Sequence, residues 1–425
     1  MRHNPGSMPG ARRGDTRAPV RVVVVALAAA LALAPAACAS DPSAPAAPPA
    51  IPTAAAPAAR TAPAPPAEAP APVDPAAACV DGVLRSLDIR ERAAQLVMAG
   101  VPADGLTGSG RAALARGVGG VILTDAAAGE ASSAQVAATV REIQQAAPIP
   151  VMIATDQEGG RVQDLAGDGF SRIPPAATQG RDVAGLRDDA RRWGREMADA
   201  GVTLDLAPVA DVVDPDLGDD NAPVGALDRG FGTNPQRVGQ AVTAFVQGME
   251  AGGVATTLKH FPGLGRVRDN TDFGDAADDV TTVDDPGLDS FRAGIAAGAP
   301  VVMMSSAVYA RIDPDDRALF SRTVVTDLLR GRLGFGGVVT TDDVGAAAAL
   351  ADVPVGERAV RFVQAGGDQV LTVRPGDVEP MVTALSAEAS GDPEFAGRLE
   401  ESARRILALK SARGLVRCSG APTGG

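Results

Sequence analysis

Lysine and histidine are almost absent from this chain of 425 residues. Among its 39 lysine and arginine residues, only Lys259 and Lys410 are lysines, and its two histidines are His3 and His260. A lysine ammonium is a compact donor and an arginine guanidinium is a planar fork, so the two are not interchangeable at a specific site. Lys259 beside His260 therefore indicates a site that needs an ammonium group, with chance adjacency at a strand end as the alternative.

Aromatic residues and positive charge are also scarce. Aromatic side chains make up 3% of the chain, so we expect a core of valine, leucine, isoleucine and alanine. The formal net charge is −13 and the main body has no basic cluster, which argues against nucleic acid as a partner. The three cysteines lack metal-ligand spacing, so we expect no structural zinc, and no other metal or cofactor.

The first segment, residues 1–37, has the organisation of a signal peptide. An arginine-containing stretch precedes an apolar run from Val22 to Ala34, which is too short for a comfortable membrane span. Residues 35–38, Pro-Ala-Ala-Cys, resemble the cleavage box of bacterial lipoproteins, in which the cysteine becomes the lipidated N-terminus. We therefore expect lipidation at Cys38 and an extracytoplasmic protein anchored to the cell membrane, with plain secretion as the alternative.

Residues 38–80 form an alanine- and proline-rich stretch that lacks the residues needed for a core. We expect a disordered linker with a reach of about 100 Å, which suits a domain tethered to a membrane and working in a cell wall. Cys79 and Cys418 lie at the two ends of the folded region. In an oxidising compartment we expect a disulfide between them, with two free thiols as the alternative. Residues 419–425 are expected to form a flexible tail.

The region from 81 to 418 alternates short apolar runs with longer alanine- and arginine-rich stretches. Several runs are continuously apolar, which is typical of parallel strands buried on both faces. Eight strands separated by helices, such as 188–200 and 234–251, predict one α/β domain, a (β/α)8 TIM barrel. An open doubly wound sheet is the alternative, but no G-x-G-x-x-G follows the first strand. The predicted strands are 95–101, 118–124, 151–156, 203–211, 255–261, 301–306, 337–342 and 369–373.

Polar and charged residues gather at the carboxyl ends of these predicted strands. In a TIM barrel the chemistry takes place at this face. Buried charges need compensation, so a ring of them indicates a binding or catalytic site, although any single member could be an exposed charge at a loop start. The residues at these ends are Asp156, Asp211, Lys259, His260, Ser305, Asp342 and Asp343.

Three motifs in order resemble family 3 glycoside hydrolases. They are ATDQEGGRVQ at 154–163, KHFPG at 259–263 and GFGGVVTTDD at 334–343, and the resemblance extends over residues 87–409. Within the family, the chain is most similar to the single-barrel bacterial β-N-acetylglucosaminidases that trim peptidoglycan fragments. The resemblance implies a catalytic barrel at 81–418 and retaining hydrolysis of terminal N-acetylglucosamine through a glycosyl-enzyme intermediate.

The resemblance also implies roles for individual residues. Asp342 would be the nucleophile. Charge-assisted hydrogen bonds hold sugar hydroxyls more firmly than neutral ones do. The residues implied to bind the terminal sugar are Asp156, Arg161, Arg229, Lys259 and His260. Many relatives carry a further arginine after the DQEGG segment, where this chain has Asp164. We interpret Asp343 and Asp211 as structural, and Trp193 as a packing residue on a helix.

The acid that must protonate the leaving oxygen departs from the family pattern. Single-barrel relatives use an Asp-x-His pair on a mobile loop after KHFPG, and the matching triplet here is Asn-Thr-Asp, ending at Asp272. His260 is the only histidine of the mature chain, so a second histidine cannot be the acid. We expect Asp272 to be the acid/base, with a pKa raised by closure beside Asp342. An ordering role for Asp272, or Asp269 or Asp275 as the acid, are the alternatives.

Three other functions stay open. A β-glucosidase of the same family would differ in the sugar it accepts. A phosphorylase would use phosphate in place of water, which a carboxylate at the acid position disfavours. A catalytically weakened wall-binding lipoprotein would keep the sugar site without turnover. Peptidoglycan-derived sugars are the expected binding partners, and we expect a monomer.

Overall fold

The computed structural model describes residues 75–124 and 130–416. The predicted signal peptide, the lipidation site Cys38 and the tail at 419–425 lie outside these residues. Cys418 lies outside them too, so its disulfide with Cys79 stays a prediction. No helix within the described part is long and apolar enough to cross a membrane.

The folded region begins earlier than predicted. Helix α1 (Pro75–Ser86) starts before the predicted boundary at residue 81, which corrects the end of the expected linker. Its alanines fit a linker as well as a helix, so composition alone did not distinguish the two. Val80 and Leu84 favour the helix because both are buried in the core.

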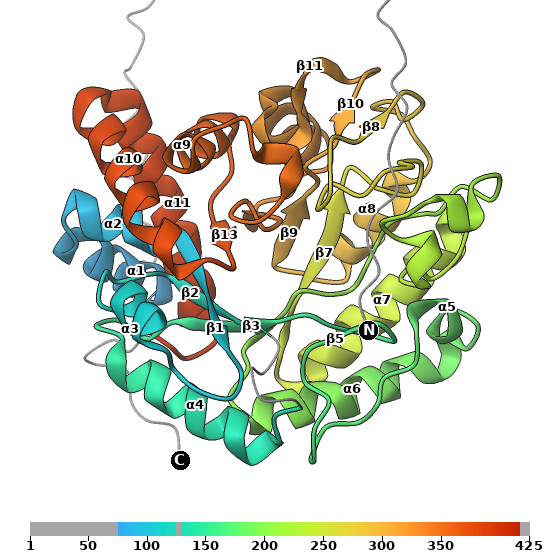
Figure 1. The fold of residues 1–425 in the computed structure, drawn as a ribbon, viewed down its shortest axis with the longest axis horizontal. Helices are drawn as coiled ribbons and strands as arrows, with labels where there is room; N and C mark the ends of the chain where they lie inside the picture. The colour runs from blue at the N-terminus through green and yellow to red at the C-terminus, as the bar shows by residue number, and fades with distance from the viewer. Residues whose placement is uncertain (1–74, 125–129, 417–425) are drawn as a thin grey trace, which may run out of the picture. The chain divides into compact units, whose positions relative to one another are not determined.

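Eight parallel strands form the centre of the fold, and their order around the sheet follows the sequence (Figure 1). Neighbours pair in parallel register, as in Met98 opposite Gly120. A bridge between Thr340 and Gln369 joins the last two strands and closes the ring, so the structure is the predicted (β/α)8 barrel. The strands are β1 (Val97–Pro102), β2 (Gly120–Thr124), β3 (Met152–Thr155), β6 (Leu204–Asp205), β7 (Ala255–Phe261), β9 (Val301–Met304), β12 (Val338–Thr341) and β13 (Val370–Thr372).

All eight strands lie where the sequence predicts them, and β7 agrees at both ends. The difference is β6, which was predicted over 203–211 and has two residues, Leu204–Asp205. Pro208 has no N–H to donate to a sheet ladder, which interrupts the regular pairing. Beyond it the chain keeps only a bridge from Val209 to Lys259.

Helices cover the outside of the barrel (Figure 1). Helix α7 lies within one residue of its predicted bounds. Asn234 caps its first turn, because its side-chain Oδ1 accepts from the N–H of Arg237 at 3.0 Å. Helix α6 begins earlier than predicted, since Asp182 caps it by accepting from the N–H of Gly185. The remaining bounds are α2 (Ile89–Gln95), α3 (Gly108–Leu114), α4 (Ser133–Ala146), α5 (Ala176–Gln179), α6 (Val183–Asp199), α7 (Pro235–Gly252), α8 (Leu288–Ala296), α9 (Val355–Ala365), α10 (Val378–Gly391) and α11 (Pro393–Ala412).

Short elements decorate the loops at the carboxyl end of the barrel. A hairpin of β4 (Gln157–Gly159) and β5 (Val162–Gln163) follows β3. A three-stranded sheet of β8 (Ala277–Asp278), β10 (Val308–Tyr309) and β11 (Asp313–Arg317) stands beside β7 and β9 (Figure 1). The other segments are the 3₁₀ turns η1 (Gly218–Asp220), η2 (Gly225–Leu227), η3 (Ala318–Phe320), η5 (Ala348–Leu350) and η6 (Pro375–Asp377), and the π-helical η4 (Thr323–Arg332).

The core is aliphatic, as the scarcity of aromatic residues predicts. Its buried side chains are mainly valine, leucine, isoleucine and alanine. Trp193 is buried on α6 and packs against Phe245, with ring centroids 6.4 Å apart. This confirms Trp193 as a packing residue.

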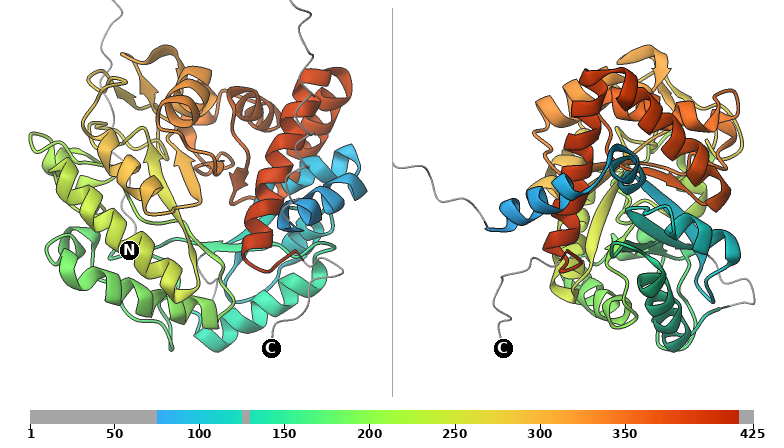
Figure 2. Two further views of the ribbon diagram at one scale, coloured as in Figure 1. Left: turned by 180° about the vertical axis from the view of Figure 1, so that it is seen from behind. Right: turned by 90° about the vertical axis from the view of Figure 1, so that its left-hand side faces the viewer.

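The first and last helices of the described fold lie side by side, with α1 and α2 against α10 and α11 (Figures 1 and 2). Lys410 of α11 is fully buried there, and its ammonium donates to Gln95 Oε1 at 2.8 Å. Gln95 in turn donates to the carbonyl of Gly117. Burial lowers the pKa of Lys410 to about 7. This second lysine therefore belongs to the packing of the helices and is not part of the site at Lys259.

Candidate active site

Strand ends and loops of the barrel bring most of the predicted polar residues together in one cavity of about 250 Å³. Asp156 follows β3 directly, Lys259 and His260 lie near the end of β7, and Asp342 follows β12. Two loops complete the wall, one carrying Arg229 before α7 and one carrying Asp272 after β7. The aliphatic side chains of the wall are Ile122, Val162, Leu206, Leu227, Leu264, Leu371 and Val373.

Lys259 lies at the centre of an ion-pair cluster. Its ammonium contacts Asp156 Oδ1 and lies 2.6 Å from Glu158 Oε1. Arg229 binds the same glutamate in a bidentate ion pair, in which Nη2 donates to Oε1 at 2.7 Å and Nε donates to Oε2 at 2.8 Å. Lys259 and Glu158 are each 2% exposed, whereas the side chain of Asp156 is 26% exposed. Of the two carboxylates, Asp156 is therefore the one that reaches a ligand.

The charges of this cluster compensate one another. Burial alone would raise the pKa of Glu158, but Arg229 and Lys259 offset that effect and lower it to about 2. Burial would also lower the pKa of Lys259, and the carboxylates of Asp156 and Glu158 raise it above its usual value instead. Burial would likewise lower the pKa of Arg229, and the carboxylate of Glu158 raises it above its usual value instead. The lysine thus stays an ammonium inside the barrel, where it is a hydrogen-bond donor fixed at the cavity wall.

Asp205 lies next to this cluster, but its pKa is shifted in the opposite direction from that of Glu158. Its side chain is fully buried, and its Oδ1 accepts from the N–H of Gln157 at 3.1 Å. Its Oδ2 has no hydrogen-bond partner. Burial raises its pKa well above the usual value, against the attraction of Lys259 and together with the repulsion of Asp156. Asp205 therefore favours the neutral carboxyl form, and Glu158 favours the charged one.

His260 is fixed by Asp211. Asp211 Oδ1 accepts the main-chain N–H of His260 at 3.0 Å and that of Leu264 at 2.8 Å, and its Oδ2 lies 2.9 Å from His260 Nδ1. The other ring nitrogen, Nε2, lies 3.9 Å from Asp342 Oδ2. Asp211 is thus structural, as predicted, but it acts by aiming the imidazole at the cavity. The Lys259–His260 peptide bond is cis.

Asp342 and Asp343 have separate roles. Asp342 lines the cavity with its side chain 29% exposed, as a nucleophile that must reach substrate requires. Asp343 uses its carboxylate on main-chain N–H groups, with Oδ1 accepting from Gly345 at 2.9 Å and Val373 at 3.0 Å, and Oδ2 accepting from Ala346 at 3.0 Å. Asp343 therefore orders the turn after β12 and ties it to the end of β13.

Asp272 lies in the loop 263–276, which we call the acid loop after the role that the sequence predicts for Asp272. It lines the same cavity as Asp342 and His260. Burial raises its pKa and the negative charge of Asp342 raises it further, while His260 and Arg229 oppose the shift. The two alternative acids, Asp269 and Asp275, line a separate cavity, which we call the outer cavity, and not the one that Asp272 lines. The geometry favours Asp272.

One predicted sugar ligand is not in the cavity. Arg161 is exposed at the turn between β4 and β5, and it does not line the cavity that holds the other predicted residues. The reason is the hairpin, since β4 and β5 pair back on each other and carry Arg161 at their connection. Sequence motifs give spacing along the chain and do not encode this reversal.

Sequence reasoning missed Glu158, the buried partner of both cations. A signal was present, because residues i and i+2 of an extended segment share one face. Asp156 and Glu158 have this spacing in DQEGG, so both carboxylates point toward Lys259. Within the described residues, no group of histidine, cysteine and carboxylate side chains has the arrangement of a metal site.

Comparisons with known proteins agree with this fold. The model of the glycosyl hydrolase family 3 N terminal domain matches residues 88–409. A β-hexosaminidase from Xanthomonas axonopodis pv. citri is 37% identical over 285 residues, which cover 64% of this chain and 82% of the relative. One from Xylella fastidiosa is 39% identical over 280 residues, covering 63% and 80%. A β-N-acetylhexosaminidase structure from Beutenbergia cavernae has a TM-score of 0.74 at 45% identity, covering 77% of this chain and 99% of that one.

A (β/α)8 barrel with several carboxyl groups in a cavity lined by charged side chains is compatible with a glycoside hydrolase. The family match spans most of the barrel and identifies the group. The chain belongs to glycoside hydrolase family 3. The resemblance carried by the three sequence motifs is thereby confirmed.

Proposed function

We propose that the protein is a retaining β-N-acetylglucosaminidase that releases terminal N-acetylglucosamine from peptidoglycan fragments. Asp342 attacks the anomeric carbon and forms the glycosyl-enzyme intermediate, while Asp272 gives its proton to the leaving oxygen. Asp272, then ionised, takes a proton from the incoming water as the intermediate is hydrolysed. The specific sugar follows from the names of the relatives, which are β-hexosaminidases and a β-N-acetylhexosaminidase.

The observation that carries this assignment is the pairing of Asp272 with Asp342 in one cavity. Two carboxyl groups of unequal surroundings are what acid and nucleophile roles require. Asp272 stays open to solvent, but partial desolvation at the cavity and the charge of Asp342 both raise its pKa. The cavity of about 250 Å³ is of the size of a single sugar unit, which suits removal of a terminal residue.

Sugar binding falls to the charged cluster around Lys259. The carboxylate of Asp156 and the Lys259 ammonium offer an acceptor and a donor to neighbouring hydroxyls, and His260 adds its Nε2 nitrogen. Arg229 lines the cavity as well, although its guanidinium is mainly engaged with Glu158 and the carbonyl of Pro223. Charge-assisted hydrogen bonds explain how a barrel poor in aromatic side chains recognises a neutral polyol.

The test compares leaving groups. For the variant Asp272→Asn, kcat/KM on N,N′-diacetylchitobiose falls about 100-fold or more, the size of a lost general acid. On 2,4-dinitrophenyl β-N-acetylglucosaminide, whose leaving group needs no proton, kcat/KM stays near that of the parent. Equal losses on both substrates would exclude Asp272 as the acid. Asp342→Asn removes activity on both.

Two parallel assays separate the alternatives. The corresponding glucoside, which lacks the N-acetyl group, distinguishes a β-glucosidase. Added inorganic phosphate distinguishes a phosphorylase, because only phosphorolysis gives a sugar 1-phosphate. A wall-binding protein without catalysis would release no sugar from either glycoside.

We also propose that the protein works outside the cytoplasm, anchored to the membrane by lipid on Cys38. The signal-like segment 1–37 and the long Ala/Pro-rich stretch that follows it support this location. Replacing Cys38 by alanine should move the full-length protein from the membrane fraction to the medium or to the soluble fraction. Unchanged retention in the membrane fraction would reject the lipid anchor.

A further inference from the structure

The acid loop is held very differently at its two ends. Its first half is pinned to the segment after β6: Asn221 donates to the carbonyls of Leu264 and Val267 at 2.7 and 2.6 Å. Gly265 packs so closely on this segment that a Cβ atom would meet the carbonyl of Val212 at 1.8 Å. Only glycine fits there, so this half of the loop is packed in place.

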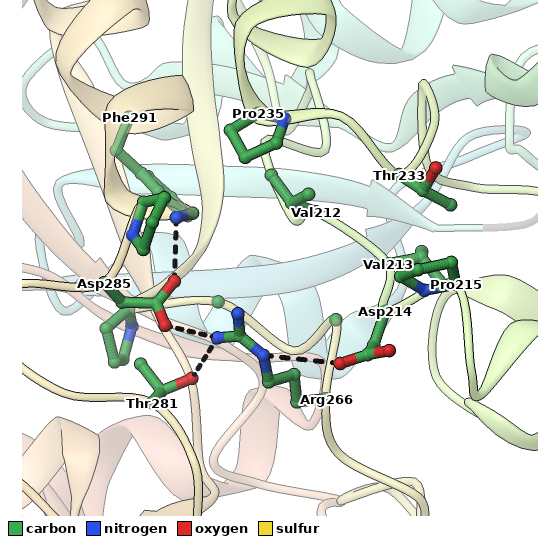
Figure 3. A pocket seen from close by; sticks show the side chains of 15 residues that line it. Val212, Val213, Asp214, Pro215, Thr233, Pro235, Arg266, Thr281, Asp285 and Phe291 are labelled. Atoms are coloured by element: carbon green, nitrogen blue, oxygen red, sulfur yellow. Dashed lines mark hydrogen bonds and ion pairs between the residues drawn. The ribbon is translucent and has the colours of Figure 1, made fainter.

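Arg266 adds an ionic anchor to the same half (Figure 3). It lies at a separate cavity of about 230 Å³, where it bonds to Asp285 at 2.5 Å and to Thr281 at 3.0 Å and pairs with Asp214 at 3.5 Å. Figure 3 shows the guanidinium between the two carboxylates. The start of the acid loop is therefore fixed by both packing and charge.

The second half, which carries Asp272, has fewer attachments. The main-chain carbonyls of Thr271 and Asp272 accept from the N–H groups of Ala349 and Ala348 at 3.1 and 3.2 Å. These alanines belong to the segment that follows Asp342. The loop that carries Asp272 is therefore hydrogen-bonded to the loop that follows Asp342. Gly274 has no heavy atom within 4 Å of its would-be Cβ, so nothing packs on the loop at this point.

One side chain braces this second half. Arg317 Nη2 lies 3.0 Å from Asp275 Oδ1 at the end of the acid loop and 3.1 Å from Asp352 Oδ1. Asp352 follows η5, the turn that contains Ala348 and Ala349. Arg317 thus joins the loop of the acid to the loop that follows the nucleophile, on the outer side of their main-chain contact.

Arg317 is well placed for such a role because its own backbone is held. It ends β11 and pairs with Val308 of β10, which pairs with Ala277 of β8 directly after the acid loop. Its side chain is 18% exposed, whereas that of Asp275 is 85% exposed. The guanidinium of Arg317 is therefore the less exposed partner in this ion pair, and the carboxylate is the more exposed one.

We propose that Arg317 is a positioning residue of the glycosidase reaction, which clamps Asp275 to Asp352 and so holds Asp272 over Asp342. This inference rests on the proposed function, in which Asp272 is the acid. Arg317 itself lines the outer cavity and not the one that holds the sugar residues, so its effect reaches the substrate through the acid loop.

The test uses kcat/KM on two substrates, N,N′-diacetylchitobiose and 2,4-dinitrophenyl β-N-acetylglucosaminide. Arg317→Ala lowers kcat/KM on the first about fivefold, the size expected from two partly exposed ion pairs, and leaves the second within about twofold. Arg317→Lys recovers part of the loss, because an ammonium can bind one of the two carboxylates. Equal loss on both substrates, or no loss on either, would overturn the clamp.

Two further variants sharpen the result. Asp275→Asn removes one partner from an exposed position without threatening the fold, and it should give the same selective loss. The double variant with Arg317→Ala should lose little more than Arg317→Ala alone, because both changes break one interaction. Additive losses would mean that the two residues act independently and would reject the clamp.

The matched control is Arg361→Ala. Arg361 lines the same outer cavity, but its ion pair with Asp316 at 2.5 Å and its stacking on Phe320 involve no residue of the acid loop. It should leave the ratio of the two kcat/KM values unchanged, and a selective loss like that of Arg317→Ala would overturn the proposal. If Asp272→Asn affects both substrates equally, the assignment of the acid fails. A selective Asp272→Asn with an unselective Arg317→Ala rejects the clamp alone.

Discussion

Asp211 holds His260 at two points, through the main-chain N–H at 3.0 Å and the ring Nδ1 at 2.9 Å. Because the carboxylate can only accept, Nδ1 carries the proton in this contact and Nε2 faces Asp342 and the sugar. A residue with no exposed surface thus determines which nitrogen of the histidine faces the cavity.

Asp211→Asn tests this relationship. The amide oxygen can still accept the main-chain N–H groups of His260 and Leu264, but the amide NH₂ now faces Nδ1 and reverses the tautomer. We expect kcat/KM to fall about 10- to 100-fold, as for a lost hydrogen bond to a charged group. Asp368→Asn is the control, because Asp368 is also buried but binds Arg330, Arg398 and Arg405 before β13. It should lower stability without affecting kcat/KM of the folded enzyme.

Glu158→Gln should destabilise the fold. The folded-state pKa of Glu158 is lowered to about 2 from 4.5, so its stabilising effect is complete above pH 4.5 and is lost as pH falls toward 2. At pH 7 the variant should lose about 3 kcal/mol of unfolding free energy, and its stability should depend less on pH between 4.5 and 2. Urea denaturation at several pH values measures both effects. A parent-like acid profile in the variant would contradict this account.

Asp205→Asn should behave in the opposite way, although Asp205 lies beside the same cluster. Its raised pKa means that ionisation of the carboxyl opposes folding as pH rises above the usual value. A neutral amide removes this penalty, so the unfolding free energy at pH 7 should stay unchanged or increase. A loss as large as that of Glu158→Gln would show that Asp205 is charged in the fold.

The pH dependence of kcat/KM on diacetylchitobiose should carry the titration of Asp272. The acid must hold its proton, so activity falls as pH rises through its pKa, and the raised pKa moves this limb to higher pH. The titratable groups that act on Asp272 are Asp342, which raises its pKa, and His260 and Arg229, which lower it. The dinitrophenyl substrate should lack the limb, because its leaving group needs no acid. An identical limb on both substrates would assign it to another group.

Lys410 should make the protein more stable at alkaline pH. Its pKa is about 7 in the fold and 10.5 when unfolded, so the fold binds the proton less well and stability rises between pH 7 and 10.5. The rise should be a few kcal/mol, about 5 at most. Lys410→Met should abolish this slope, while leaving the Oε1 acceptor of Gln95 without its donor. The same slope in the variant would show that another group titrates.

Much of the barrel could be predicted because its signals are local. The short run of β7 between helical stretches predicts a strand with the correct ends, and Asn234 marks the start of α7 by a cap that needs only its own first turn. The misplaced boundaries have tertiary causes. Helix α1 is stabilised by Val80 and Leu84, which are buried in the core. The position of Arg161 has a tertiary cause too, because it lies at the connection of the β4–β5 hairpin and does not line the cavity.

By itself, the sequence determined the strand order, the family and the residues that meet at the strand ends, since each follows from periodicity or from a contiguous motif. Only the tertiary structure decided which charges are buried together and therefore how each one titrates. The pKa of Glu158 is lowered because two cations outweigh its burial, and the pKa of Asp205 is raised because burial, with the repulsion of Asp156, outweighs the attraction of Lys259. The brace from Arg317 to Asp275 likewise joins segments that no pattern along the chain connects.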